Sequence, residues 1–226
     1  ERRPWGRREE MDSQDSDEAG AEAGLVYEND TALLQQAWMN ERSSPEILHH
    51  KTELVERTLD AVHEQEERIE LLGQEAAREL ECTVYKRELT RIKYLLRSYL
   101  RARLSKVEAH VLHILMRGDL TDRLSDAEKD FANGFTNMLS THFDGNVLDH
   151  MPEQFQNLLK SSEARDDDDM IPTPNLDEHV FCRVKKDVGN FELDEDETVD
   201  LGRGDIYLIR FRPVRQLLAD DDVELI

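Results

Sequence analysis

The chain has 226 residues, with 51 acidic and 29 basic side chains and a formal net charge of −22. A field of that sign repels phosphate, which argues against a protein that coats nucleic acid through its general surface. No apolar stretch approaches the ~20 residues that span a membrane. Cys82 and Cys182 form no CxxC pair, which excludes a disulfide scaffold or thiolate zinc site and fits a reducing compartment.

The N-terminal segment is acidic and poor in apolar residues. Residues 1–10 precede the first methionine and are interpreted as an expression remnant or upstream translation. Small, polar and acidic residues follow as far as Gly24, so residues 1–30 as a whole are predicted to be a disordered acidic tail. Two roles stay open for it: a solubilising tail, or a peptide that folds when it docks on a partner.

Helical periodicity predicts an all-α domain over residues 31–161. Thr31 is expected to cap the first helix, and Pro45 to occupy the first turn of the second. Gly73 is expected to end that second helix. Apolar residues recur every seven positions along one face of it, at Leu48, Val55, Val62 and Ile69.

A third helical segment, from about residue 75 to residue 116, contains no glycine or proline. One long helix or two stacked pieces are expected there, ending at Gly118. Ser125 and Glu128 then form a capping box that opens a fourth helix. Four helices with short connections favour an antiparallel bundle or a close relative.

Composition changes after the helices. Acidic residues and two prolines predict an extended linker over residues 162–174. Short alternating apolar segments over 175–226 favour a small β-rich domain, with a helical turn near Pro213 and a last strand at Val223–Ile226. The predicted fold class is α+β: an N-terminal all-α helical bundle, an acidic linker and a small β-rich C-terminal domain.

Motifs that would indicate catalysis or a metal centre are weak. The ExxH at Glu46 and the nearby His63 are explained better by a solvated helix surface than by a di-iron bundle. The zinc-protease-like pattern that begins at His63 has Glu67 in place of the second histidine. Gly202-Arg-Gly204 is a lone GxG that a hairpin turn explains. The sequence therefore predicts no enzyme, no cofactor and no metal.

The stretch from Glu88 to Glu108 is the most informative. At about 100° per residue its apolar side chains cover one arc, and Arg103 and Lys106 fall inside that arc. A buried cation needs a partner, so we expect both to pair with carboxylates within the bundle or across a subunit contact; snorkelling to solvent is the alternative. Four arginines lie on the opposite side of this helix: Arg87, Arg91, Arg97 and Arg101. They could form a solvated face, contact an acidic protein surface or, as the last choice, contact DNA phosphate.

Several sequence blocks resemble one known family. The blocks are AWMNER (37–42), RIKYLLRSYLRARLSKVE (91–108), HMP (150–152), NLDEHVFCRV (175–184) and the closing IYLIRF and VELI. In order and spacing they are similar to the Sld-five subunit (subunit four) of the eukaryotic GINS complex, from about Leu33 to Ile226. Lys93 stands where that family usually has arginine, and Val107 where it usually has isoleucine.

This resemblance implies a nuclear heterotetramer of four related subunits, each with a helical A domain and a β-rich B domain. It implies that GINS joins the MCM ring and a RecJ-like cofactor in the replicative CMG helicase, as a scaffold that meets DNA only indirectly. Some relatives recruit a trimeric fork hub through an N-terminal peptide; that role stays open here, because the tail matches no such motif.

On this hypothesis the chain contacts its sister subunits and the helicase through residues of the helical domain and of the chain end. The alternative, from another class, is a DNA-binding module that uses the basic face of the third helix. The candidate partner-contact residues are Trp38, Arg91, Tyr94, Arg97, Tyr99, Arg101, Arg103, Lys106, Leu225 and Ile226.

Overall fold

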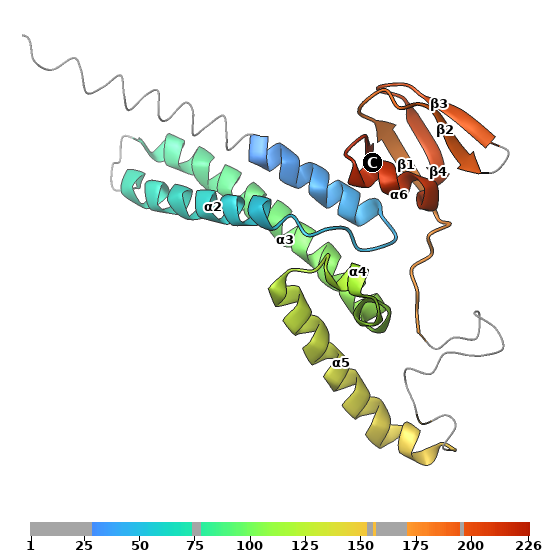
Figure 1. The fold of residues 1–226 in the computed structure, drawn as a ribbon. Helices are drawn as coiled ribbons and strands as arrows, with labels where there is room; N and C mark the ends of the chain where they lie inside the picture. Colours follow the sequence, from blue (N-terminus) through green and yellow to red (C-terminus); the bar gives the residue numbers. More distant parts are fainter. Residues whose placement is uncertain (1–28, 74–77, 153–155, 157–170, 195–196) are drawn as a thin grey trace, which may run out of the picture. The chain divides into compact units, whose positions relative to one another are not determined.

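A computed structural model describes residues 29–73, 78–152, 156, 171–194 and 197–226. Residues 1–28 of the predicted tail and residues 162–170 of the predicted linker lie outside the described residues, whereas residues 29 and 30 already belong to a helix. Helices occupy the described chain as far as His150 and strands follow from His179, so the predicted α+β class is confirmed (Figure 1). The limits set for the A and B domains stay a prediction.

Contacts divide the chain into two compact units. The first contains residues up to Gln35 together with Glu53–Leu95, and the second contains Gln36–Thr52 and Leu96–Ile226. Each unit has its own apolar core, so each is described separately below.

The first unit is built on α2 (Thr52–Leu72) and the beginning of α3 (Glu79–Met116). Gly73 follows α2 directly and donates its N–H to the carbonyl of Ile69 at 2.9 Å, so the predicted end of this helix is confirmed. Across the pair, the Lys93 ammonium of α3 contacts the Glu66 carboxylate of α2. The core side chains come from both helices and are Val62, Ile69, Cys82, Leu89 and Ile92.

Two predicted helix starts are wrong. The first helix already covers residues 29–43, so Thr31 lies inside it. Pro45 lies in the non-helical segment 44–51, and the second helix starts at Thr52. The reason is that carbonyl oxygens of this segment, which a helix would use internally, accept hydrogen bonds from Lys106, Arg103 and Arg123 instead.

The third helix combines both predicted options. It is assigned as one helix as far as Met116, with a non-helical backbone at His110 (φ −127°, ψ 25°). Gly118 does not simply end it, as predicted; it begins the short helix α4 (Gly118–Thr121). The chain therefore bends twice before the fourth long helix begins.

The predicted capping box is confirmed. The Ser125 hydroxyl accepts from the Glu128 N–H at 3.3 Å, and the Glu128 carboxylate accepts from the Ser125 N–H at 3.0 Å. This satisfies two donors at the start of α5 (Asp126–Asn146), which is followed by the 3₁₀ turn η2 (Leu148–His150). The helical core of the second unit consists of Ile47, Val107, Val111, Leu112, Ile114, Leu120, Leu124, Ala132 and Ile171.

The β-rich part of the second unit has two antiparallel sheets and one helix (Figure 1). One sheet has the strand order β4-β1-β5 and the other pairs β2 with β3. The elements in chain order are β1 (His179–Val184), β2 (Gly189–Asp194), β3 (Glu197–Leu201), β4 (Ile206–Arg210), α6 (Phe211–Ala219) and β5 (Val223–Leu225).

Alternate residues of β1 and β5 face an apolar core that α6 completes. Val223 and Leu225 are buried and Glu224 is half-buried, so the predicted alternation of the last strand is confirmed. The core side chains are Val180, Cys182, Val184, Leu201, Ile209, Phe211, Val214, Leu217, Val223 and Leu225, with Leu48 packed against them.

The predicted hairpin at Gly202-Arg-Gly204 is wrong. This turn joins β3 to β4, which belong to different sheets. Gly204 has φ +92°, a region that favours glycine, and its N–H donates to the carbonyl of Val184 at 2.8 Å. The Val184 N–H in turn donates to the carbonyl of Asp205 at 3.0 Å, so the turn is attached to β1 and β4 pairs with β1.

The last strand should contribute most of its stabilisation through one side chain. Leu225 is 2% exposed and Ile226 is 40% exposed. Leu225→Ala should lower the free energy of unfolding by about 2–5 kcal/mol, because it opens a cavity in the β core. Ile226→Ala, the matched control, should cost less than about 1 kcal/mol. Urea unfolding of both variants measures this, and equal losses would show that the strand is not part of the core.

Candidate partner interface

The second unit contains a fully buried arginine. Arg103 of α3 is 0% exposed, and each of its five N–H groups donates to an oxygen of the same chain. Its Nε and Nη2 form a bidentate pair with the Glu128 carboxylate, at 2.7 and 2.9 Å. Nη1 donates to Glu41 Oε2 at 3.0 Å and to the Leu48 carbonyl at 2.7 Å, and Nη2 also donates to the Arg123 carbonyl at 3.0 Å.

Opposite charges around Arg103 keep it ionised. Burial by itself would lower the pKa of the guanidinium, but the hydrogen bonds to Glu128 and the charge of Glu41 raise it overall. Burial likewise opposes ionisation of Glu128, and the hydrogen bonds from Arg103 outweigh it, so the pKa of that carboxyl lies below its usual 4.5. Both groups are therefore charged at neutral pH.

Lys106 lies one turn further along α3 and shares a carboxylate with Arg103. Its ammonium donates to Glu41 Oε1 at 2.8 Å, to the Ser44 hydroxyl at 2.7 Å and to the Glu46 carbonyl at 2.9 Å. Burial lowers the pKa of Lys106, and the charge of Glu41 partly opposes that shift. The predicted pairing of Arg103 and Lys106 with carboxylates is confirmed, and the partners belong to the chain itself.

A second buried carboxylate connects these residues to the β-rich part of the unit. Glu46 Oε1 lies 3.2 Å from Arg123 Nη1 and 2.6 Å from Nε of Arg215, which belongs to α6. Arg123 Nη1 also donates to the Ile47 carbonyl at 2.9 Å. We call the residues of this network the ionic core: Glu41, Glu46, Arg103, Lys106, Arg123, Glu128 and Arg215.

Tyr99 belongs to the surroundings of the ionic core. The Arg103 guanidinium lies 5.8 Å from its ring centroid, and the Tyr99 hydroxyl accepts from the Lys51 N–H at 3.2 Å. Tyr99 and Arg103 are both buried, so other residues of the chain lie between either side chain and a partner protein. Their assignment to a partner interface stays a prediction.

Other predicted contact residues are exposed. In the first unit, Arg91 and Tyr94 lie on α3, and Tyr94 is 63% exposed. In the second unit, Arg97 and Arg101 are exposed on the continuation of the same helix. These four side chains are accessible to a partner.

The remaining candidates lie near the two ends of the described chain. Trp38 is half-buried, with the Arg42 guanidinium 5.8 Å from its ring centroid. The Leu225 N–H donates to Asn40 Oδ1 at 2.8 Å, and the Ser43 hydroxyl donates to the Ile226 carbonyl at 3.3 Å. The end of β5 is thus attached to helix 29–43 within the second unit.

Sequence reasoning missed most members of the ionic core. Glu128 was visible only as a helix cap, and Glu41 only as part of a resembling block. Arg123 and Arg215 stand in segments with no motif, so no local signal could find them. Within the described residues, no group of three or more His, Cys, Asp or Glu side chains could hold a metal ion, and no helix is long and apolar enough to cross a membrane.

Two protein-family models match this chain. A family model described as the GINS complex protein helical bundle domain matches residues 54–145, and one described as the DNA replication complex GINS protein SLD5 C-terminus matches residues 174–226. A helical bundle followed by a small β-rich region therefore defines this protein as a subunit of the GINS type.

Similarity extends over whole proteins. An Arabidopsis thaliana protein named DNA replication complex GINS protein SLD5 is 39% identical over 215 residues, which cover 92% of this chain and 98% of that protein. Proteins of the same name from Rattus norvegicus and Homo sapiens are 36% and 35% identical, over 96% of this chain and 98% and 99% of their own lengths. The chain belongs to the SLD5 family of the DNA replication complex GINS.

The ionic core should depend on Arg103 far more than on exposed arginines of the same helix. Arg103→Ala leaves the Glu41 and Glu128 carboxylates buried without their main partner and should cost about 3–5 kcal/mol of stability. Arg97→Ala, the exposed control on α3, should cost less than about 1 kcal/mol. Thermal unfolding of the two variants compares them, and equal, small shifts would contradict the role assigned to Arg103.

The charge of Glu128 should make part of the stability pH-dependent. Because its pKa is lower in the folded chain than the usual 4.5, its stabilisation is complete above that pH and is lost as the pH falls through the folded value. Glu128→Gln should be less stable than the wild type at pH 7, and the gap should narrow below about pH 4.5. Urea unfolding at several pH values measures the gap; a constant gap would exclude this linkage.

Proposed function

We propose that this chain is a non-catalytic scaffold subunit of the GINS heterotetramer. In this role it joins the MCM ring and a RecJ-like cofactor in the CMG helicase during initiation and elongation of DNA replication in the nucleus. The observation that carries the proposal is the similarity to GINS SLD5 proteins over more than nine-tenths of the chain, as with the 39% identical Arabidopsis relative.

The state of the buried charges supports a structural role. Every N–H of Arg103 is occupied by an internal acceptor, and the Glu128 carboxylate is shared between that guanidinium and a helix cap. Groups saturated in this way position backbone segments. They offer neither an open nucleophile nor a free general base.

Exposed apolar side chains support assembly with partner chains. In the first unit, Leu71 is exposed on α2. Leu80 and Tyr94 are exposed on α3, and the exposed fraction of Leu80 is 79%. In the second unit, Met138 and Phe143 are exposed on α5, which is otherwise tied to the ionic core through its first turn. If a partner chain covers these side chains, it removes apolar surface from water, which favours association.

We propose that Arg91 and Tyr94 contact a sister subunit. An exposed aromatic ring beside an arginine is the composition that dominates binding energy at protein interfaces. The partner surface would be acidic where it meets Arg91. For Arg97 and Arg101, in the second unit, we propose contacts of the same chemistry.

Co-expression with the three sister GINS subunits tests both parts of the proposal. The wild-type chain should co-purify with them in equal amounts, whereas the chain expressed alone should self-associate or aggregate. Arg91→Glu should reduce recovery of the complex at least tenfold, because it places a like charge against an acidic partner. Arg203→Glu, the matched change at an exposed arginine of the turn before β4, should not. A soluble monomer that captures no sister subunit would refute the scaffold role.

The second candidate function is a DNA-binding module, and the exposed arginines of α3 are the observation that favours it. Salt dependence separates the two, because log affinity for duplex DNA falls by about 0.9 per neutralised phosphate for each unit of log salt. A steep slope that Arg97→Ala and Arg101→Ala reduce would favour DNA contact. A chain that binds sister subunits and shows no such slope favours the scaffold.

A further inference from the structure

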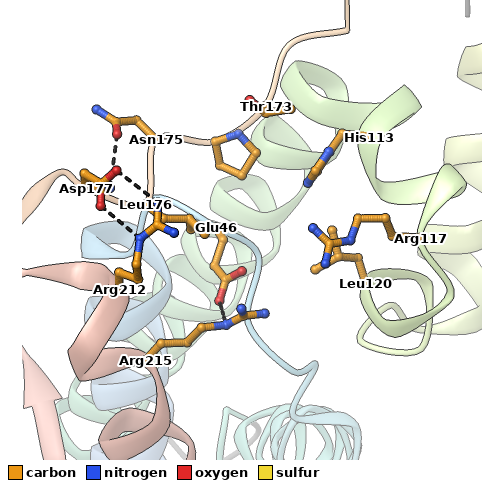
Figure 2. Close-up of a pocket in the computed structure, with 11 residues that line it drawn as sticks. Glu46, His113, Arg117, Leu120, Thr173, Asn175, Leu176, Asp177, Arg212 and Arg215 are labelled. Atoms are coloured by element: carbon orange, nitrogen blue, oxygen red, sulfur yellow. Dashed lines mark hydrogen bonds and ion pairs between the residues drawn. The ribbon is translucent and has the colours of Figure 1, made fainter. Parts of the chain in front are cut away.

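The second unit contains a pocket of about 440 Å³ (Figure 2). It shares Glu46 and Arg215 with the ionic core, and its other lining residues lie outside that network. His113 of α3 and Arg117, which directly follows α3, line one wall. Arg212 and Arg215 of α6 line the opposite wall, and the segment 173–177 runs from the His113 side to the Arg212 side (Figure 2). Figure 2 shows Arg117 and His113 directed toward the space that Arg215 faces from the other side.

The two carboxylates of the pocket are already engaged on their own wall. Both oxygens of Asp177 accept from Arg212, at 2.9 and 3.0 Å. Glu46 Oε1 forms ion pairs with both Arg215 and Arg123, so one carboxylate charge is shared between two guanidinium groups. Across the pocket, Arg117 forms an ion pair with the exposed Asp119, whose Oδ1 lies 3.4 Å from Arg117 Nε.

The lining therefore has an excess of positive charge in a protein of net charge −22. Among the residues that line the pocket, three arginines face two carboxylates. The charges near the pocket also act on His113. Burial and the charges of Arg117 and His110 lower its pKa, and the charges of Asp119 and Glu46 only partly oppose that shift. An anion placed between the walls would relieve the repulsion.

We propose that this pocket binds a phosphate monoester carried by a side chain of a partner protein. Guanidinium groups form bidentate pairs with phosphate oxygens, and Arg117 and Arg215 offer such groups from opposite walls. The volume lies in the range of ligand sites, about 300–1,000 Å³. Leu120, Leu176 and Pro174 supply an apolar wall for the carbon stem of the modified side chain.

The lining chemistry disfavours nucleic acid as the source of the phosphate. Among the described residues, no Phe, Tyr or Trp lines the pocket to stack on a base, and stacking supplies much of the affinity for single strands. The overall negative charge also repels a polyanion, whereas a single phosphate on a protein needs only the local excess. The proposal is independent of the GINS role, because it rests on the pocket alone.

The test follows the imidazole signals of His113 by NMR in the full-length chain, isotope-labelled and purified together with the sister subunits that keep it soluble. Inorganic phosphate, titrated against chloride at constant ionic strength, should shift these signals saturably and raise the pKa of His113. A phosphoserine peptide should do the same, and its unphosphorylated form should not. Arg117→Ala should weaken phosphate binding at least tenfold, since this exposed side chain can be removed without opening a core.

Arg203→Ala is the matched control and should bind phosphate as the wild type does. The proposal is overturned if phosphate causes no saturable shift of His113, or if Arg117→Ala binds as tightly as the wild type. Tighter binding of a single-stranded oligonucleotide than of the phosphopeptide, with the same dependence on Arg117, would also overturn it, because the phosphate would then belong to nucleic acid.

Discussion

The second unit depends on the buried guanidinium of Arg103. Removing such a charge from water costs several kcal/mol, and only complete hydrogen bonding in good geometry recovers that cost. Five acceptor oxygens are therefore required at once: one from the Glu41 carboxylate, two from the Glu128 carboxylate, and the carbonyls of Leu48 and Arg123. Because a misplaced segment would leave the charge unpaired, this requirement specifies one arrangement of the segments around α3.

The ionic core also explains an irregular segment and a pocket. Residues 44–51 stay non-helical because their carbonyls accept hydrogen bonds from side chains of α3 and from Arg123. Glu46, held in that segment, then meets Arg215 of α6 and so connects the helical core to the β-rich part. The pocket with excess positive charge lies beside Glu46 and Arg215, and a separate hydrogen bond attaches Leu225 to Asn40.

The long helix α3 serves two purposes on opposite sides. Its inner side holds the ionic core through Arg103 and Lys106, which are satisfied within the chain. Its outer side leaves arginines and Tyr94 accessible. This division suits a subunit of an assembly: the buried cations are paired within the chain, and the exposed side chains remain available to partners.

Local patterns in the sequence determined the class and the elements of this protein. Periodicity placed α2, Gly73 marked its end, and Ser125 predicted a capped helix, because each effect acts within a turn or two of helix. The burial and pairing of Arg103 were also predicted, since a cation on an apolar arc needs a counter-charge. Only the tertiary structure decided which carboxylates pair with it, why Pro45 starts no helix and why the turn at Gly204 joins two sheets. Each depends on hydrogen bonds to segments distant in sequence, which no local pattern encodes.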